Sequence, residues 1–367
     1  MQNPQKLKTS CFESGVVAAR PGQMYGWGGI TRIKGREILV STNERKFHVC
    51  PFGREVVVRS LDGGRTWQLP QEVYNSELDD RDSNLLTMPD GTIVMTWFTS
   101  TAFEQPGYFR PEWKARVERL TQKIRDEVAG KWLLRSYDGG HTWETTPHRV
   151  PIGEHAGPTV LADKSLIYID HYPCHDGREM TVFVSRDVGE TWEKTAIVSC
   201  PRLKQKDGLL FPILNENHVL EVEPGKLLAL FRSTAGGSGA LYQSDSEDNG
   251  RTWTEARELP IWGFPPHLIK LSCGAIMCAY SHRREPWSIR VVLSYDKGKT
   301  WDTDNIITLC EWKDKPDMGY PVSVEVEPGE ILTVYYCSRE DSIHIRHEEK
   351  IKGSTPEGLL YTRFRLG

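Results

Sequence analysis

One eight-residue phrase occurs five times in this chain, and it constrains the fold more than any other feature. Each copy reads Ser-x-Asp-x-Gly-x-Thr-Trp, and the copies are Ser60–Trp67, Ser136–Trp143, Ser185–Trp192, Ser246–Trp253 and Ser294–Trp301. An Asp carboxylate can accept hydrogen bonds from the backbone of a tight turn, Gly tolerates a positive φ, and Trp can pack against a neighbouring sheet. The phrase therefore predicts a repeated hairpin turn, which is a folding device rather than a site of chemistry.

A second repeat indicates how many structural units the chain contains. An apolar strand introduced by a turn recurs six times, at Lys34–Val40, Pro89–Met95, Ala162–Tyr168, Pro224–Leu230, Ser272–Cys278 and Pro328–Val334. Repeats of this kind are typical of four-stranded blades around a channel. We therefore expect an all-β, six-bladed β-propeller that forms a single domain over residues 1–367. The last strands of the sixth blade are expected at Ile343–Arg346 and Leu359–Phe364, and a strand near Gly15–Ala19 should pair with this C-terminal segment and close the ring.

Composition excludes several classes of partner. The formal net charge is −4, which argues against binding to nucleic acid or to an anionic membrane. No apolar run approaches the ~18 residues of a membrane-spanning helix. Met1–Lys8 is polar and unlike a signal peptide. The eight cysteines include no Cys-x-x-Cys pair, and several, such as Cys273 and Cys278, fall in apolar strands. We expect them to be reduced and buried, which favours the cytoplasm, although a secreted chain trimmed of its leader would look the same.

One segment departs from the β pattern. Residues 111–129 begin with Pro, are rich in helix formers, and place Trp113, Val117, Leu120, Ile124 and Val128 on one helical face. The pattern predicts a helix inserted in the second blade. It could cover an exposed edge, close over a pocket, or mediate contact with a second copy of the chain in a homo-oligomer.

With these repeats the chain resembles the sialidase superfamily of β-propellers, in which the repeated phrase is called the Asp-box. The resemblance implies a glycoside hydrolase with a carbohydrate substrate, whose chemistry lies in loops at one end of the channel. It implies no metal or other cofactor. The spacing of His171 and His175 is too unspecific to predict a metal site.

Two segments resemble the catalytic strands of that family. In the first, Glu216 precedes a strand pair that ends at Arg232, and the resemblance implies that the Glu polarises a nucleophilic Tyr while the Arg binds the substrate carboxylate. In the second, Tyr320 precedes a strand, a turn and another strand, which implies that Tyr320 is the nucleophile. The ordinary pKa of Tyr is about 10, so a neighbouring carboxylate that accepts its proton is needed. Sialidases are the known exception to the use of two carboxylates in glycosidases.

Further substrate-binding arginines follow from the same resemblance. An arginine-containing loop precedes the last Asp-box strand, and Arg283 is the first choice there, with Arg284 and Arg290 as substitutes. Bidentate Arg suits carboxylate recognition, and two adjacent arginines on a strand cannot both point inward. Arg45 resembles another family Arg that contacts substrate.

Two family features are missing. The first-blade Arg is replaced by the stretch Tyr25–Ile30, in which Trp27 would offer a stacking face. The loop 43–55 has no counterpart of the general-acid Asp, so His48 or Glu44 could carry the proton. In the second blade, Arg81 is a candidate substrate contact and Asp82 a candidate acid or sugar-binding residue, although Asp also favours turns.

Three functions remain open from the sequence. The first is an exo-acting, retaining, sialidase-like glycoside hydrolase that cleaves a terminal acidic or polar sugar with Tyr320 and Glu216. The second is a hydrolase or lyase for an acidic polysaccharide that uses His48, His155 or His218 for proton transfer, since His titrates near neutrality. The third is a non-catalytic glycan-binding propeller.

Overall fold

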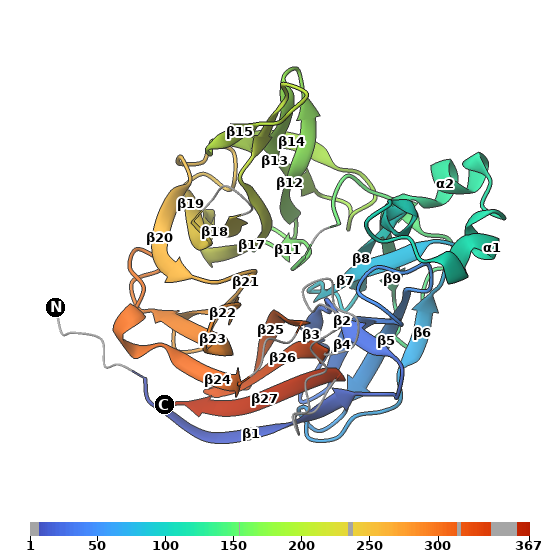
Figure 1. Ribbon diagram of the computed structural model, residues 1–367. Coiled ribbons are helices and arrows are strands. Elements are labelled where there is room, and N and C mark those ends of the chain that lie inside the picture. Colours follow the sequence, from blue (N-terminus) through green and yellow to red (C-terminus); the bar gives the residue numbers. More distant parts are fainter. Residues whose placement is uncertain (1–6, 154, 234–237, 314–316, 339–357) are drawn as a thin grey trace.

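Six mainly antiparallel sheets are arranged in a ring in the computed structural model (Figure 1), and we call the axis of the ring the channel. The structure describes residues 7–153, 155–233, 238–313, 317–338 and 358–367. The prediction of an all-β, six-bladed propeller is confirmed. The expected strand at Ile343–Arg346 lies outside the described residues. We number the blades in chain order and call the strand nearest the channel the inner strand.

Blade 1 contains β2 (Met24–Gly26), β3 (Ile30–Arg32), β4 (Ile38–Arg45), β5 (Arg54–Ser60) and β6 (Gln71–Tyr74). Blade 2 contains β7 (Asp79–Thr87), β8 (Ile93–Ser100), β9 (Gly130–Ser136) and β10 (His148–Arg149). Blade 3 contains β11 (Thr159–Val160), β12 (Leu166–Cys174), β13 (Gly177–Ser185), β14 (Glu193–Val198), β15 (Arg202–Lys204) and β16 (Leu210–Pro212). Blade 4 contains β17 (Leu214–Glu223), β18 (Lys226–Ser233), β19 (Ala240–Ser246) and β20 (Arg257–Trp262). Blade 5 contains β21 (Pro266–Lys270), β22 (Ile276–His282), β23 (Trp287–Ser294) and β24 (Ile307–Trp312). Blade 6 contains β25 (Asp317–Glu327), β26 (Glu330–Ser338), β27 (Gly358–Leu366) and β1 (Thr9–Ala18).

The two ends of the chain close the ring in one blade. Strand β1 pairs antiparallel with β27, and Gly15 lies opposite Tyr361. The N-terminal strand is thus the outermost strand of blade 6, and the described ends of the chain lie near each other (Figure 1). Closure removes the free edge that an open sheet of this size would expose. The predicted pairing of the two ends is confirmed.

The cores lie between the blades. Alternate residues of one strand enter the cores on opposite sides of its blade: Leu39 packs with blade 2, whereas Ile38 and Val40 pack with blade 6. The same division holds for Leu332 and Ile331 in blade 6. Because side chains alternate across a strand and both faces are covered, the strands read as continuous apolar runs.

The Asp-boxes form the outer turns of blades 1 to 5. In the first, Asp62 Oδ1 accepts hydrogen bonds from the backbone of Arg65 and Thr66, both 2.9 Å, and Gly64 donates to Ser60 Oγ at 2.8 Å. These bonds to the ionised carboxylate outweigh the effect of burial and lower the pKa of Asp62 to about 2. Ser60 pairs with Ile38 at the start of β4, so the boxes lie at the end of the channel opposite to that where β4 ends.

The box glycine also docks each blade on the one before it. A Cβ at Gly64 would lie 2.7 Å from Leu332 of blade 6, and one at Gly298 would lie 2.8 Å from Leu228 of blade 4. Gly64 and Gly298 also have positive φ values, of 83° and 85°. Gly is therefore required at this position for two reasons: the positive φ of the backbone and the close approach of the preceding blade.

The inserted segment is helical, as predicted, but it is divided into short pieces. They are η1 (Ala102–Glu104), η2 (Pro111–Trp113), α1 (Lys114–Val117) and α2 (Gln122–Val128), and η3 (Thr303–Asn305) lies in blade 5. Trp113 and Leu120 are buried in a small apolar core that also contains Val49 and Cys50 of the loop between β4 and β5. The predicted apolar face thus packs on this loop, which lies next to the site described below.

Two smaller features differ from expectation or extend it. Blade 3 carries an additional hairpin, because β16 pairs with the beginning of β13 and with β15. Cys278 is buried as expected, whereas Cys273 is exposed because it occupies the turn before β22 rather than the strand itself.

The double requirement for glycine in the Asp-box is testable by urea unfolding. We expect Gly298→Ala to lower the free energy of unfolding by about 1–3 kcal/mol more than Gly274→Ala does. Gly274 has nearly the same φ, 89° against 85°, but no atom lies within 4 Å of the position that a Cβ would take there, so it isolates the backbone cost. Equal losses in the two variants would show that docking against Leu228 contributes nothing.

Candidate active site

Three residues from blades 4 and 6 form a hydrogen-bonded cluster at one mouth of the channel. The Tyr320 hydroxyl donates to Glu216 Oε1 at 2.5 Å, and Arg232 Nη1 donates to Glu216 Oε2 at 2.6 Å. Arg232 Nη1 also lies 3.4 Å from the Tyr320 oxygen. The inner strands β17 and β25 begin at this mouth, and β18 ends there, so the fold brings together residues that are far apart in the sequence.

β-Bulges direct these side chains. Glu216 and Tyr320 have φ values of 33° and 53°, and each lies where the register of its inner strand shifts against the second strand. Asp82 of blade 2 has the same arrangement, with a φ of 56°. A bulge inserts one residue and re-aims its side chain, and such strained positions concentrate at functional sites. Because these residues are not glycines, nothing in the sequence signals the bulges.

The charges of the cluster fix the resting protonation states of Glu216 and Tyr320. Burial tends to raise the pKa of Glu216, but Arg232 and the hydrogen bond from Tyr320 outweigh it, so the net pKa is lowered and the carboxylate is ionised. Burial and the charge of Glu216 raise the pKa of Tyr320 well above its usual value, and Asp82 adds to this effect. At neutral pH the pair is thus a phenol that donates to a carboxylate.

Two adjacent arginines diverge at the end of β22. The guanidinium of Arg283 lies 5.3 Å from the centre of the Tyr320 ring, whereas Arg284 stacks on Trp262 at 4.2 Å. Nε and Nη2 of Arg283 are buried, and neither has a hydrogen-bond partner among the described residues. Gly319 permits this approach, since a Cβ there would lie 2.7 Å from Arg283 Nη2. Of the predicted alternatives, the structure therefore places Arg283 in the cluster.

Trp27 forms a wall of the site with two arginines. Arg45 and Arg81 lie 5.0 and 4.7 Å from the centre of its ring, and both contact Asp79. Trp27 is only 2% exposed and Arg45 is fully buried. The expected open stacking face on Trp27 is therefore covered, and Arg45 is held behind the wall by Asp79 rather than exposed to a substrate.

His48 lies on the loop between β4 and β5 and reaches blade 6. Its Nδ1 lies 2.6 Å from Asp317 Oδ2, and Asp317 Oδ1 accepts a 2.8 Å hydrogen bond from the Tyr336 hydroxyl. The edge of the His48 ring meets Trp27, with ring centroids 4.6 Å apart, and Trp27 also meets Tyr320 at 6.3 Å. His48 is a predicted site residue, whereas nothing in the sequence indicates Asp317, because 269 residues separate the two.

The backbone of Asp82, at its bulge, is hydrogen-bonded to a side chain of blade 1. Its N–H donates to Asn43 Oδ1 at 2.7 Å, and the Asn43 amide in turn donates to Glu55. Burial raises the pKa of Glu55 well above its usual value. Glu44, the other candidate acid of the loop 43–55, binds Arg20 and Arg54 at 2.9 and 3.0 Å.

Two histidines of the inner strands, His218 and His267, connect neighbouring blades. His218 Nδ1 accepts a hydrogen bond from the backbone N–H of Leu268, and His267 Nδ1 accepts one from Ser323, so each links its inner strand to that of the next blade. Burial lowers the pKa of His218 to about 3 and that of His267 well below its usual value, which keeps both rings neutral. His155 meets the Tyr320 ring edge-on at 4.7 Å and remains a member of the cluster.

Arg290 does not join the cluster. Its Nε donates to Ser288 Oγ within β23, the third strand of blade 5. Its positive charge tends to lower the pKa of Tyr280 and of His282, which shows that it lies near these two residues. The third strand lies away from the channel, so a substrate at Tyr320 would not meet this residue. The prediction that Arg290 could substitute for Arg283 is thus not supported by its position.

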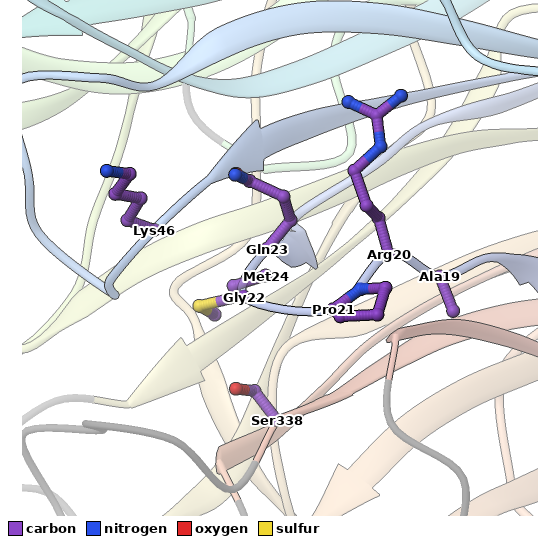
Figure 2. Close-up of a pocket in the computed structure, with 8 residues that line it drawn as sticks. All are labelled: Ala19, Arg20, Pro21, Gly22, Gln23, Met24, Lys46 and Ser338. Carbon is purple, nitrogen blue, oxygen red and sulfur yellow. The ribbon is translucent and has the colours of Figure 1, made fainter.

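A surface cavity of about 270 Å³ lies beside the mouth, lined by residues 19–24, Lys46 and Ser338 (Figure 2). Arg20, Gln23 and Lys46 extend to the same side of it in the figure. Ser338 pairs with Asp317, so the cavity borders the His48 loop, but Tyr320 and Glu216 are not among its lining residues. The cavity is therefore a neighbour of the site and not the site itself.

Neither a metal centre nor a membrane span is found within the part of the chain that the structure describes. No group of three or more His, Cys, Asp or Glu side chains there is arranged to hold a metal ion. No helix in the same residues is long and apolar enough to cross a membrane.

Comparison with known proteins places these features in a family. Residues 112–333 match the family model described as BNR repeat-like domain. No curated protein matches the chain in sequence. A Dyadobacter fermentans protein of unknown function has a similar structure, with a TM-score of 0.76 and 20% identity over 99% of this chain and all of that chain.

Two sialidase structures are also similar. NanB sialidase of Streptococcus pneumoniae has a TM-score of 0.65 and 15% identity over 95% of this chain and 69% of that one. The intramolecular trans-sialidase of Ruminococcus gnavus has the same TM-score and identity over 93% of this chain and 94% of that one. At these identities the likeness shows the fold alone.

The buried neutral histidines predict acid sensitivity. The pKa is about 4 for His155 and about 3 for His218 in the native state, against about 6.5 in an unfolded chain. Between these values only the unfolded state takes up the protons, so stability should fall as pH drops below about 6.5, by up to about 1.4 kcal/mol per pH unit for each group.

Urea unfolding at pH 7.5, 6 and 5 measures this slope. His218→Asn keeps an acceptor for the Leu268 N–H but cannot titrate, so we expect a slope shallower by nearly one proton. An unchanged slope in His218→Asn would contradict a neutral buried His218.

Proposed function

The chain belongs to the family of BNR repeat-like domains, and we propose that it is an exo-acting, retaining glycoside hydrolase that cleaves a terminal acidic sugar. The observation that carries this proposal is the 2.5 Å hydrogen bond from Tyr320 to Glu216, with Arg232 on the other carboxylate oxygen. A solvated surface Tyr, Glu and Arg would not be gathered from two blades at the mouth of the channel.

The proposed reaction has two halves. In the first, the Tyr320 oxygen attacks the anomeric carbon, its proton passes to Glu216, and the bond to the leaving group breaks as an acid at the mouth protonates the leaving oxygen. In the second, water attacks the anomeric carbon and gives a proton to the same acid–base group, the bond to Tyr320 breaks, and Glu216 returns its proton to the tyrosine. A phenol is neutral before attack, so it does not repel an anionic sugar, and Arg232 keeps Glu216 ionised to receive the proton.

Arginines support the choice of an acidic sugar. The buried Nε and Nη2 of Arg283 form one edge of its guanidinium, which matches the two oxygens of a carboxylate. Nε of Arg232 is likewise buried without a partner among the described residues. The NanB structure holds an ammonio-ethanesulfonate and the trans-sialidase structure holds oseltamivir carboxylate, and each of these ligands carries an anionic sulfonate or carboxylate group.

The sequence departure in blade 1 favours a second candidate. Trp27 stands where sialidases carry a first arginine, and His155 touches the Tyr320 ring. A hydrolase or lyase for an acidic polysaccharide, with a histidine as the proton-transfer group, would use the same arginines. A lyase would release an unsaturated product that absorbs in the near ultraviolet, and a non-catalytic glycan-binding propeller would release no product.

Loss of one hydroxyl tests the nucleophile. We expect Tyr320→Phe to lower kcat on an aryl sialoside by at least about 1000-fold and to prevent trapping of a glycosyl-enzyme by a fluorinated substrate analogue. Tyr137→Phe is the matched control, because Tyr137 is exposed on an Asp-box turn at the other end of the channel. Mild loss in Tyr320→Phe together with severe loss in His155→Ala would support the second candidate instead.

The diverging arginines test recognition of the anion. We expect Arg283→Ala to weaken binding of a sialic-acid glycal analogue by about 10- to 100-fold, since a charge-assisted hydrogen-bonded contact is lost. Arg284→Ala removes the same charge one residue away and should change affinity by less than about twofold. Calorimetric titration of both variants decides the matter, and equal effects would show that only the general positive charge matters.

A further inference from the structure

The carboxylate of Asp317 fixes the orientation and tautomer of His48. One oxygen of Asp317 accepts from Tyr336, and the other faces His48 Nδ1 at 2.6 Å. The pKa of Asp317 is lowered to about 2, because His48 and further partners outweigh the effect of burial. An ionised carboxylate only accepts hydrogen bonds, so Nδ1 must carry a hydrogen, and Nε2 is the ring atom that gains or loses a proton.

This pair lies next to the nucleophile. Asp317 precedes Tyr320 by three residues in β25, and the rings of His48 and Tyr320 both meet Trp27, at 4.6 and 6.3 Å. The other acids of the loop 43–55 are engaged elsewhere, Glu44 with two arginines and Glu55 with Asn43. His48 is therefore the titratable group that this loop presents to the mouth.

The inserted helices hold the loop in place. Phe47 and Phe52, on either side of His48, meet Trp113 of η2 with ring centroids 6.0 and 6.5 Å apart. Arg110 stacks on Phe47 at 3.9 Å. Such packing restricts the loop in the way that a preorganised catalytic group requires. The inserted helices thus contribute to the site by holding the loop in place, and this role requires no movement of a lid.

We propose that His48, oriented by Asp317, donates the proton to the leaving-group oxygen and later accepts one from the attacking water. This rests on the proposed function. In the first half-reaction imidazolium Nε2–H protonates the glycosidic oxygen as the C–O bond breaks and Tyr320 bonds to the anomeric carbon. In the second, neutral Nε2 takes a proton from water as its oxygen replaces Tyr320, which restores the imidazolium. Asp317 is a positioning residue and exchanges no proton with the substrate.

The surroundings of His48 set the expected pH dependence. Burial lowers its pKa, Arg81 and Arg45 lower it further, and Asp317 opposes them, with a net pKa below the usual value. The charge of Arg283 also helps to lower the pKa of Asp317. The donor form is therefore depleted as pH rises, and kcat/KM for a substrate with a poor leaving group should fall on the alkaline side of this pKa. Asp317→Asn removes the opposing charge and should shift this fall to lower pH.

The experiment compares two sialosides that differ in leaving group. A 4-nitrophenolate leaves without a proton, whereas methoxide needs one. We expect His48→Ala to lower kcat/KM for the methyl glycoside by at least about 100-fold but for the 4-nitrophenyl glycoside by less than about 10-fold, consistent with the usual size of general acid catalysis. Azide should restore turnover of the 4-nitrophenyl glycoside by the variant, since it needs no base. The control is His141→Ala, on an exposed Asp-box turn.

Several outcomes would overturn the proposal. Equal losses on the two glycosides in His48→Ala would show a structural role, and a leaving-group-dependent loss in Asp82→Asn instead would make Asp82 the donor. Nitrogen NMR of labelled histidine provides a test that needs no substrate: we expect neutral His48 to carry its hydrogen on Nδ1, and the Nε2–H tautomer would refute the assignment. Failure of the proposed function is distinguishable, because Tyr320→Phe would then retain activity or neither glycoside would be cleaved by the unaltered protein.

Discussion

The antiparallel pairing of β1 with β27 is the constraint on which the rest of the structure depends. It completes blade 6 and holds it against blade 1 across an apolar core that contains Trp27, Tyr320 and Tyr336. This seam lies under the candidate active site, because Tyr320 and Asp317 come from blade 6 whereas Trp27 and His48 come from blade 1. Tyr320 and its neighbours are positioned by the same contacts that close the ring.

Pairing of opposite charges makes so polar a mouth compatible with burial. Glu216 is paired with Arg232, and Arg45 with Asp79, so each charge taken out of water has a partner of opposite sign. Arg283 has two buried donors without a partner among the described residues, whereas Arg232 and Arg45 have one each. An unpaired buried donor is costly, and this cost is the reason for proposing an anionic ligand at the site.

The same device, a bulge in an inner strand, occurs in three blades. Asp82, Glu216 and Tyr320 each adopt a positive φ at a register shift near the start of that strand. Rigid neighbouring strands can sustain such strain, whereas an isolated hairpin would relax it. The propeller thus supplies equivalent positions around the channel, and three of them carry an Asp, a Glu and a Tyr.

The sequence by itself determined the number of blades, the turns and the closing strand, because these follow from turn chemistry and from strand patterns within a few residues. It also indicated Tyr320, Glu216 and Arg232, through the resemblance of their strand pairs to those of the sialidase superfamily. Only the tertiary structure decided between Arg283 and its neighbour Arg284, covered the face of Trp27, and joined His48 to Asp317. Those outcomes depend on which way side chains point at bulges and on contacts between blades, and neither is encoded by residues that are close in the chain.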